Sequence, residues 1–230
     1  MTSKSSKESG EYNLTIAEIR HKCSLLAEQG EWEKCIGLWR SALGLTRDAD
    51  RCGDWFIVRL NLAIELGQSP KDFSEDTIEE AIGLLHGIEA AISSKECPRE
   101  YAITQLALGQ AFSKRIQGSR HENMGEVLRY YKGALAYFEE EGDAIVVAEI
   151  IANIGNTHAE KVMGWRGVSA VEAFKLRKQH YREAVKCYKI ALATFTESEF
   201  EEEYRELTEK IQILEGLIER VDQGLANLVR

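Results

Sequence analysis

The side chains that could bind a metal or act as nucleophiles are scattered along the 230-residue chain. Its five histidines form no HExxH motif and no i, i+4 pair, the spacing that places two ligands on one helical face. No GxSxG, Walker or dinucleotide-binding motif is present. A Cys–His pair assembled in space stays open as an alternative, but nothing in the sequence favours one. We therefore expect no enzyme, no catalytic residue, no metal and no cofactor.

The cysteines give the same indication. They are Cys23, Cys35, Cys52, Cys97 and Cys187, and no two form a CxxC motif. A disulfide framework or a zinc site uses closer, paired spacing. The pattern is typical of small buried apolar side chains in a reducing compartment.

Composition and charge restrict the class of partner. With 44% apolar and 29% charged residues, the chain can bury a core. A formal net charge of −9 argues against wholesale wrapping by nucleic acid or binding to an anionic membrane. No apolar stretch is long enough to span a membrane, and the polar start MTSKSSKESGE lacks the apolar core of a secretory signal. These features favour a cytoplasmic protein or one of the plastid stroma.

The spacing of apolar residues predicts an all-α fold. From Tyr12 onward they recur at intervals of three and four, and no long period-2 run predicts a strand. Only two prolines are present to interrupt helices. Residues 1–11 are expected to be disordered. The predicted helices span 13–28, 32–47, 52–67, 74–94, 98–116, 123–141, 143–163, 169–196 and 199–229.

Two patterns repeat along these helices. Alternate helices carry a small or apolar residue, a bulky one four later and usually Ala three after that: Cys35–Trp39–Ala42, Ala81–Leu85–Ile88, Val127–Tyr131–Ala134 and Ala184–Tyr188–Ala191. The intervening helices place Ala63, Gly109 and Gly155 at one register, where small side chains let neighbouring helices cross closely. We expect leucine at Gly109 or Gly155 to destabilise the fold strongly, and alanine to do little harm.

These patterns resemble the tetratricopeptide repeat, a helix–turn–helix unit with small residues at fixed positions. The stretch EQGEWEKC, with Gly30 and Trp32, has the standard turn of that unit. The stretch YAITQLALGQAFSKRIQGSRHENMGEVLRYYKGAL looks like the long-turn repeats of cyanobacterial arrays. The resemblance implies an α-solenoid of four helix pairs over residues 12–196, with a C-terminal capping helix over 197–230.

The same resemblance implies a groove lined by the first helix of each pair. Carried over by register, its candidate residues are Arg20, Asn61, Gln110, Lys114, Asn153 and Asn156. Side-chain amides there would suit the backbone of an extended or helical peptide. The family's carboxylate clamp for chaperone tails is at best partial, because Ile103 and Ala107 stand where it needs basic residues.

A basic loop occurs twice, 46 residues apart, as SKRIQGSRHEN from Ser113 and AEKVMGWRGVS from Ala159. Gly118 and Gly164 are expected to end helices in the left-handed conformation. The cations of these loops are expected to satisfy the carbonyls at helix ends, and a second role as a basic contact surface is the alternative. They are Arg115, Arg120, Lys161 and Arg166.

Charge is unevenly distributed toward the C-terminus. Residues 161–189 carry eight cations against two acids, and residues 197–215 carry eight glutamates against two cations. The two segments could neutralise each other, or the first could form a basic edge that steers an acidic partner. The candidate residues of this basic edge are Arg120, Lys161, Trp165, Arg166, Lys175, Lys178 and Arg182.

The last predicted helix has an unbroken apolar stripe with eight positions, from Tyr204 to Leu228. Such a stripe needs a cover, which either the preceding helix or a second copy of the chain could supply. A short connection between the two helices favours the first arrangement and a monomer. A homodimer through this helix is the alternative.

Together these observations favour a non-catalytic protein–protein interaction module, an adaptor or assembly factor whose partner is a protein or peptide with an acidic segment. By analogy with long-turn arrays, assembly of a photosynthetic complex is one setting. The alternative is a nucleic-acid-binding or regulatory protein that uses residues 161–189, although few aromatic residues are interleaved with its cations.

Overall fold

The structure, a computed structural model, describes residues 14–68, 75–161 and 167–228. Within those ranges all regular elements are helical and no strand occurs, which confirms the all-α class. The helices are α1 (Ile16–Glu28), α2 (Trp32–Ala42), η1 (Leu43–Leu45), α3 (Asp54–Gln68), α4 (Glu75–Ala91), α5 (Pro98–Lys114), α6 (Arg120–Glu141), α7 (Ala144–Glu160), α8 (Ala170–Ala191) and α9 (Glu201–Leu228). The expected disorder of residues 1–11 concerns residues outside these ranges.

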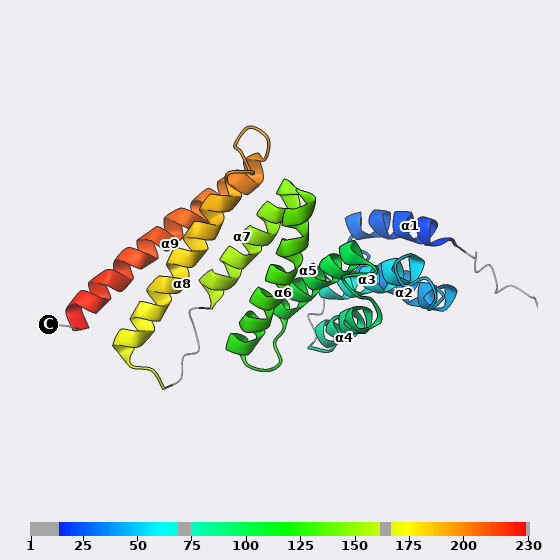
Figure 1. Cartoon of the computed structure of the whole chain (residues 1–230), viewed down its shortest axis with the longest axis horizontal. Coiled ribbons are helices and arrows are strands. Elements are labelled where there is room, and N and C mark those ends of the chain that lie inside the picture. Colours follow the sequence, from blue (N-terminus) through cyan, green and yellow to red (C-terminus); the bar gives the residue numbers. More distant parts are fainter. Residues whose placement is uncertain (1–13, 69–74, 162–166, 229–230) are drawn as a thin grey trace, which may run out of the picture.

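Each helix packs against the next one along the chain, so the molecule is an elongated row (Figure 1). The row runs from α1 and α2 at one end to α8 and α9 at the other. Besides these sequential contacts, α3 also packs directly on α5. A chain of local contacts of this kind builds a long surface rather than one central core.

Short polar side chains cap the N-termini of several helices. Thr15 caps α1 in a capping box: the Glu18 backbone N–H donates to Thr15 Oγ1 over 3.3 Å, and the Thr15 N–H donates to Glu18 Oε2 over 2.8 Å. Ser119 and Ser169 cap α6 and α8 in the same position. The cap at Ser119 is why α6 starts at Arg120, three residues before the predicted start.

Two helices end five residues before the predicted position. The helix predicted over 32–47 stops at Ala42 and continues as the short 3₁₀ helix η1. The helix predicted to end at 196 stops at Ala191 and is followed by turns. At α6 a left-handed Gly142, with φ of 73°, ends the helix and lets α7 start two residues later.

Two of the small residues that share one register, Gly109 and Gly155, do lie at close helix crossings. A Cβ built on Gly109 would lie 2.5 Å from Cε1 of Tyr131, and one built on Gly155 would lie 2.6 Å from Cε1 of Tyr188. Both rings are buried, with 3% and 1% of their surface exposed, and have little room to move. The prediction that alanine is tolerated at these two glycines is therefore wrong, because even one methyl group meets a ring.

The apolar stripe of the last helix packs within the chain. Leu207, Ile211, Leu214 and Val221 are buried where α9 lies along α8. The stripe thins out at its end, where Leu228 is half exposed. The expectation of a cover in the same chain is confirmed, while the monomer stays a prediction. None of the helices in the described ranges is long and apolar enough to cross a membrane.

The cysteines depart from the prediction at one pair. Cys23 and Cys35 are buried as expected, and the Cys35 thiol donates to the Cys23 carbonyl over 3.3 Å. Cys52 is exposed, however, and is joined to Cys97 by a disulfide bond. The fold brings the turn before α3 against the turn before α5, so that the two Cα atoms lie 5.9 Å apart. Such long-range proximity is invisible in the spacing of the sequence.

Candidate functional site

Three adjoining hollows follow one face of the helix row. The first lies between α3 and α5 and encloses about 280 Å³, the second lies between α5, α7 and α9 and encloses about 470 Å³, and the third lies between α7 and α9 and encloses about 210 Å³. Asn153 of α7 lines all three, and Ser113 and Tyr131 line the first two. We call this continuous depression the groove.

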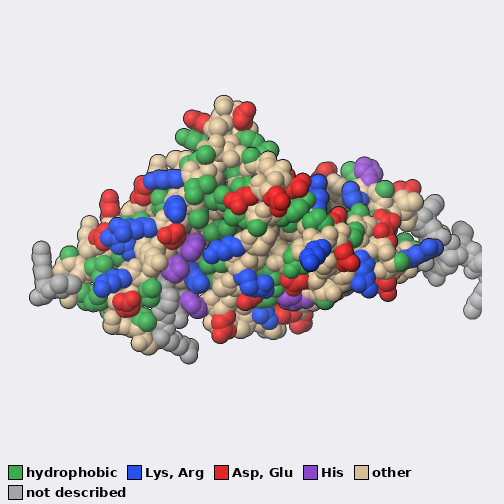
Figure 2. Space-filling model, in the orientation of Figure 1, with side chains coloured by type: hydrophobic (Ala, Val, Ile, Leu, Met, Phe, Trp, Pro, Cys, Tyr) green, Lys and Arg blue, Asp and Glu red, His purple; other side chains and the backbone are tan. Residues whose placement is uncertain are grey.

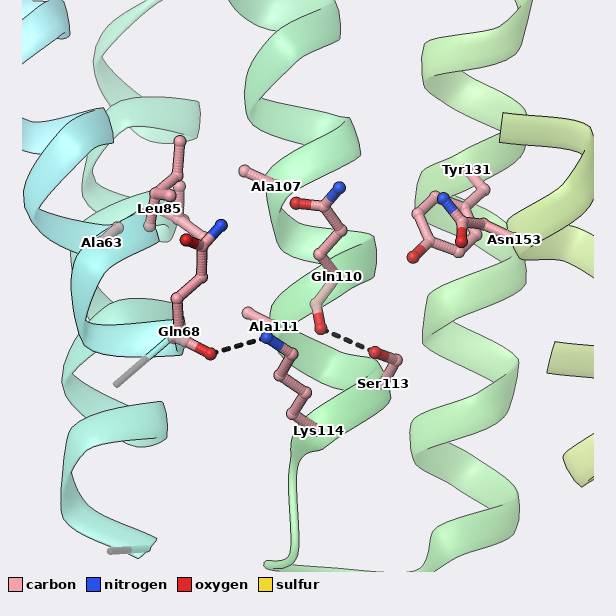
Figure 3. A pocket seen from close by; sticks show the side chains of 12 residues that line it. Ala63, Gln68, Leu85, Ala107, Gln110, Ala111, Ser113, Lys114, Tyr131 and Asn153 are labelled. Carbon is pink, nitrogen blue, oxygen red and sulfur yellow. Dashed lines mark hydrogen bonds between the residues drawn. The ribbon is translucent and has the colours of Figure 1, made fainter. Parts of the chain in front are cut away.

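The first hollow is organised by α5 (Figure 3). Ala107 and Ala111 lie on the side of α3, whereas Gln110 and Ser113 lie on the side of Tyr131 and Asn153. Two small alanines leave the space between α3 and α5 open, and the polar side chains line its rim. The helical spacing of these residues produces both faces from a single stretch of α5.

Lys114, the last residue of α5, joins it to α3. Its ammonium group donates a hydrogen bond of 2.7 Å to the carbonyl of Gly67, near the C-terminal end of α3. A cation at that position satisfies an orphan carbonyl and the negative helix end. Partial burial lowers the pKa of Lys114 below its ordinary value. The lysine thus contributes to the wall of the groove.

Asn156 connects three helices at the other end. Its Oδ1 accepts from the Tyr188 hydroxyl over 2.8 Å and from Lys210 Nζ over 3.0 Å. Lys210 of α9 also pairs with Glu206, at 2.5 Å. The amide oxygen of Asn156 is therefore occupied in holding α7, α8 and α9 together.

The amides of Gln110 and Asn153 are not occupied in this way. Asn153 Oδ1 receives only a 3.5 Å contact from Asn156 Nδ2. Among the residues that the structure describes, neither Asn153 Nδ2 nor the side-chain amide of Gln110 has a hydrogen-bond partner. Both lie in the groove, Gln110 on α5 and Asn153 on α7, so each can donate to and accept from a bound molecule.

The α9 end of the groove is acidic. Glu149 of α7 and Glu203 and Glu206 of α9 line the third hollow. Partial burial, together with Asp143 and Glu203 nearby, raises the pKa of Glu149 above its ordinary value. Carboxylates of a bound molecule would be repelled there.

Four of the six predicted groove residues therefore come together: Gln110, Lys114, Asn153 and Asn156. The other two do not. Arg20 is exposed on α1 and lines none of the three hollows, and Asn61 donates to the Ile57 carbonyl of its own helix over 2.7 Å.

Sequence reasoning missed two kinds of groove residue. Tyr131 and Tyr188 were predicted only as the bulky residues of a repeated helix pattern, yet both line the second hollow. Lys210 and Glu206 come from α9, which was predicted only as a cap. The repeat pattern could have suggested the tyrosines. Nothing in the sequence shows which turn of α9 lies opposite Asn156.

The repeated basic loop has a different structure from the predicted one. α5 ends at Lys114 because Arg115 is extended, and Gly118, with φ of 78°, lies beyond that end and precedes the cap Ser119. The side-chain amide of Asn123 ties the loop by donating to the carbonyls of Arg115 and Gln117, over 3.2 and 2.8 Å. The predicted left-handed conformation of Gly118 is confirmed, but the prediction that this glycine ends the helix is wrong. Its counterpart Gly164 lies outside the described residues.

The two arginines of the loop between α5 and α6 have different roles. Arg115 forms a two-pronged ion pair with Glu79 of α4, with distances of 2.7 and 3.0 Å, and does not cap a helix end. Arg120 does cap one, because it donates to the Ser113 carbonyl over 2.6 Å while it also pairs with Glu160. Lys161 follows the last residue of α7 directly.

The basic edge is partly neutralised within the chain. Lys178 pairs with Asp222 and Lys189 with Glu215, both on α9. Lys175 and Arg182 remain exposed, and no ion-pair partner for either occurs in the described ranges. Figure 2 shows positive and negative side chains mixed across the face in view. Trp165 and Arg166 lie outside the described residues.

A histidine pair lies where α7 meets α8. Nδ1 of His158 and Nδ1 of His180 are 3.0 Å apart, so one ring must donate and the other accept. Burial lowers the pKa of both, that of His180 to about 4 with a contribution from His158 itself. Within the described ranges no group of three or more His, Cys, Asp or Glu side chains could hold a metal ion.

Comparison with known proteins adds no relative. No protein-family model matches the chain, and no curated protein matches it either. The family resemblance therefore stays an expectation, and the function has to be argued from the groove.

Proposed function

We propose that the chain is a non-catalytic interaction module, built of tetratricopeptide-like helix pairs with α9 as the cap, that binds a segment of another protein in the groove. The observation that supports this most is the pair of available amides, Gln110 and Asn153, in one continuous hollow. An adaptor or assembly factor needs such a surface and no catalytic group.

An extended peptide fits the chemistry of the groove. Its backbone offers a donor and an acceptor at each residue, and a side-chain amide can pair with both. Tyr131 and Met124, both nearly fully buried, form an apolar floor in the second hollow, and the exposed Ile213 supplies apolar surface there. Because Glu149, Glu203 and Glu206 line the α9 end, a basic or neutral residue of the peptide is favoured there.

An acidic segment of the partner is better placed outside the groove. Lys175 and Arg182 of α8 are exposed and keep their positive charge available. Nucleic-acid binding through residues 161–189 is less well supported, because Lys178 and Lys189 are already paired with acids of α9.

Peptide selection followed by a matched set of variants tests the proposal. Peptides selected from a display library of random short sequences against the wild-type chain should bind in the micromolar range. Gln110→Ala with Asn153→Ala should weaken them roughly 5- to 150-fold, since each of the two lost hydrogen bonds contributes about 0.5–1.5 kcal/mol. Gln223→Ala, which removes an exposed amide of α9 that does not line the groove, should change nothing.

Two results would reject the groove as the site. One is a library that yields no binding peptide. The other is a set of peptides that bind the double variant as tightly as the wild type while its melting temperature is unchanged.

A further inference from the structure

We propose that Cys52 and Cys97 form a reversible thiol–disulfide site whose redox state sets how firmly α3 and α5 are held together. The inference does not depend on what the groove binds. It rests on where the two cysteines lie, which of them is accessible and what else joins the two helices.

The bond connects the N-terminal ends of two helices that are not neighbours in the chain. Cys52 lies in the turn before α3, and Cys97 occupies the N-cap position of α5. Their Cα atoms are 5.9 Å apart, a separation that a disulfide can bridge, and the two residues are 45 positions apart in the chain. The cross-link therefore closes a loop that contains all of α3 and α4.

The two sulfur atoms differ in access. Cys52 is exposed, whereas Cys97 has 3% of its surface exposed. An attacking thiolate can reach Cys52 from solvent. The free cysteines of the described chain lie elsewhere, Cys23 and Cys35 between α1 and α2 and Cys187 on α8, so reduction requires an external dithiol.

The exchange proceeds in two steps with balanced electrons. A thiolate of the external dithiol attacks Cys52 Sγ, a mixed disulfide forms, and the electron pair of the broken bond leaves on Cys97 Sγ. That thiolate lies at the N-terminus of the 17-residue α5, where backbone N–H groups and the helix dipole stabilise negative charge. The second thiol of the reductant then displaces Cys52 as a thiolate and departs as a disulfide. Both protein thiolates take up protons from water.

Reduction would break the covalent link between α3 and α5 and leave the hydrogen bond of Lys114 in place. The hydrogen bond of Lys114 to the Gly67 carbonyl joins the C-terminal ends of these helices, and the disulfide joins their N-terminal ends. Arg51, beside Cys52, also donates to the Ala91 carbonyl at the end of α4, over 2.9 Å. In the reduced protein this hydrogen bond remains, but no covalent bond holds the turn before α3 against α5.

Thermal melting of the oxidised and the reduced full chain tests the inference. Closing a loop of this length should raise the melting temperature of the oxidised form by roughly 5–15 °C. Dithiothreitol added to the folded protein should abolish that difference, and oxidised glutathione should restore it. Thiol titration after denaturation should find three free cysteines before reduction, Cys23, Cys35 and Cys187.

Two variants separate the cross-link from a general effect of reductant. Cys52→Ser changes an exposed side chain, so it should fold, melt with the reduced wild type and ignore reductant. Cys187→Ser should keep the full redox-dependent shift. Five free thiols in protein exposed to oxidised glutathione would overturn the proposal. Reduction that occurs only after denaturation would also overturn it, because the site would then not be reversible in the folded chain.

Discussion

The α5–α6 and α7–α8 crossings share their packing and differ in their polar groups. In each, a glycine of the first helix lies against a buried tyrosine of the second, Gly109 against Tyr131 and Gly155 against Tyr188. The Tyr188 hydroxyl is bound by Asn156, which Lys210 of α9 also contacts. Among the described residues the Tyr131 hydroxyl has no hydrogen-bond partner.

The difference has a simple cause. α9 packs on α8 at the second crossing and supplies the cation that completes its polar network. α7 packs on α6 at the first crossing in the same way, but among the described residues it supplies no cation and no hydrogen bond to the Tyr131 hydroxyl. The glycine–tyrosine pair thus fixes the apolar contacts of both crossings, and α9 decides which polar groups stay available. We expect binding at the α5–α7 part of the groove and a mainly structural role at α9.

The largest effect should come from the two glycines. Leucine at Gly109 or Gly155 should cost about 3–5 kcal/mol of unfolding free energy, and alanine about 1–3 kcal/mol, because the added atoms meet a buried ring. Urea denaturation measures both. Gly87→Ala, where an added Cβ meets nothing within 4 Å, should be neutral or stabilise by up to about 1 kcal/mol. Alanine variants as stable as the wild type would refute the shared packing.

The next prediction concerns the pH dependence of stability, which should differ between the α7–α8 and α5–α6 crossings. His158 and His180 join α7 to α8, whereas Phe112 and Tyr130 pack their rings, 5.5 Å apart, where α5 meets α6. The pKa of His180 in the folded chain is about 4, below its ordinary value, so the unfolded chain binds more protons as pH falls. The stability that this depressed pKa contributes is fully present above about pH 6.5 and should decrease progressively as the pH falls toward 4.

Other charged groups act on the same histidines. Glu183 favours their protonation, while Lys161, Lys132 of α6 and His121 of α6 oppose it. Carboxylates titrate in this range too, so the informative quantity is the difference between wild type and His180→Gln. The variant should lose less stability than the wild type between about pH 7 and pH 4.5 in urea denaturation. Parallel pH profiles would show that the pair does not titrate as described.

A smaller effect should distinguish two asparagines that lie three residues apart on α7. Asn156→Ala leaves Tyr188 and Lys210 without their acceptor and should cost about 1–2 kcal/mol. Asn153→Ala removes an amide with only one weak contact and should change stability by less than about 0.5 kcal/mol. Equal losses would mean that the Asn153 amide supports the fold to the same extent as that of Asn156.

The smallest effect belongs to the basic edge. Lys175→Glu and Arg182→Glu should each shift the melting temperature by a degree or so, because neither side chain has an ion-pair partner among the described residues. Lys178→Glu should cost up to about 1 kcal/mol, since it breaks the pair with Asp222. A large loss from Lys175→Glu would show that this edge supports the fold.

Helix positions and the close crossings could be predicted because they depend on local spacing. The steps from Val127 to Tyr131 and from Ala184 to Tyr188 indicated which face of each helix is buried. Helix ends were less predictable where a single cap decided them, as at Ser119. The ion pair of Arg115 could not be predicted from local spacing either, because its partner Glu79 lies 36 positions earlier in the chain.

The site was predictable only in part for the same reason. Register on α5 and α7 predicted Gln110 and Asn153 as groove residues, and both line the first hollow. The roles of Asn156 and of Cys52 depend on which distant segment the fold brings beside them, α9 in one case and the start of α5 in the other. Such contacts follow from the packing of whole helices, which the spacing of residues does not encode.

The central claim is that a peptide binds in the α5–α7 part of the groove, where α9 leaves the polar side chains available. Titration of the ¹⁵N-labelled chain with a selected peptide, followed by NMR of the side-chain amide groups, tests it most directly. The signals of Gln110 and Asn153 should shift with peptide concentration, and that of Asn156 should move little because its oxygen is already bound. Shifts confined to α8, with both groove amides unchanged, would contradict the account.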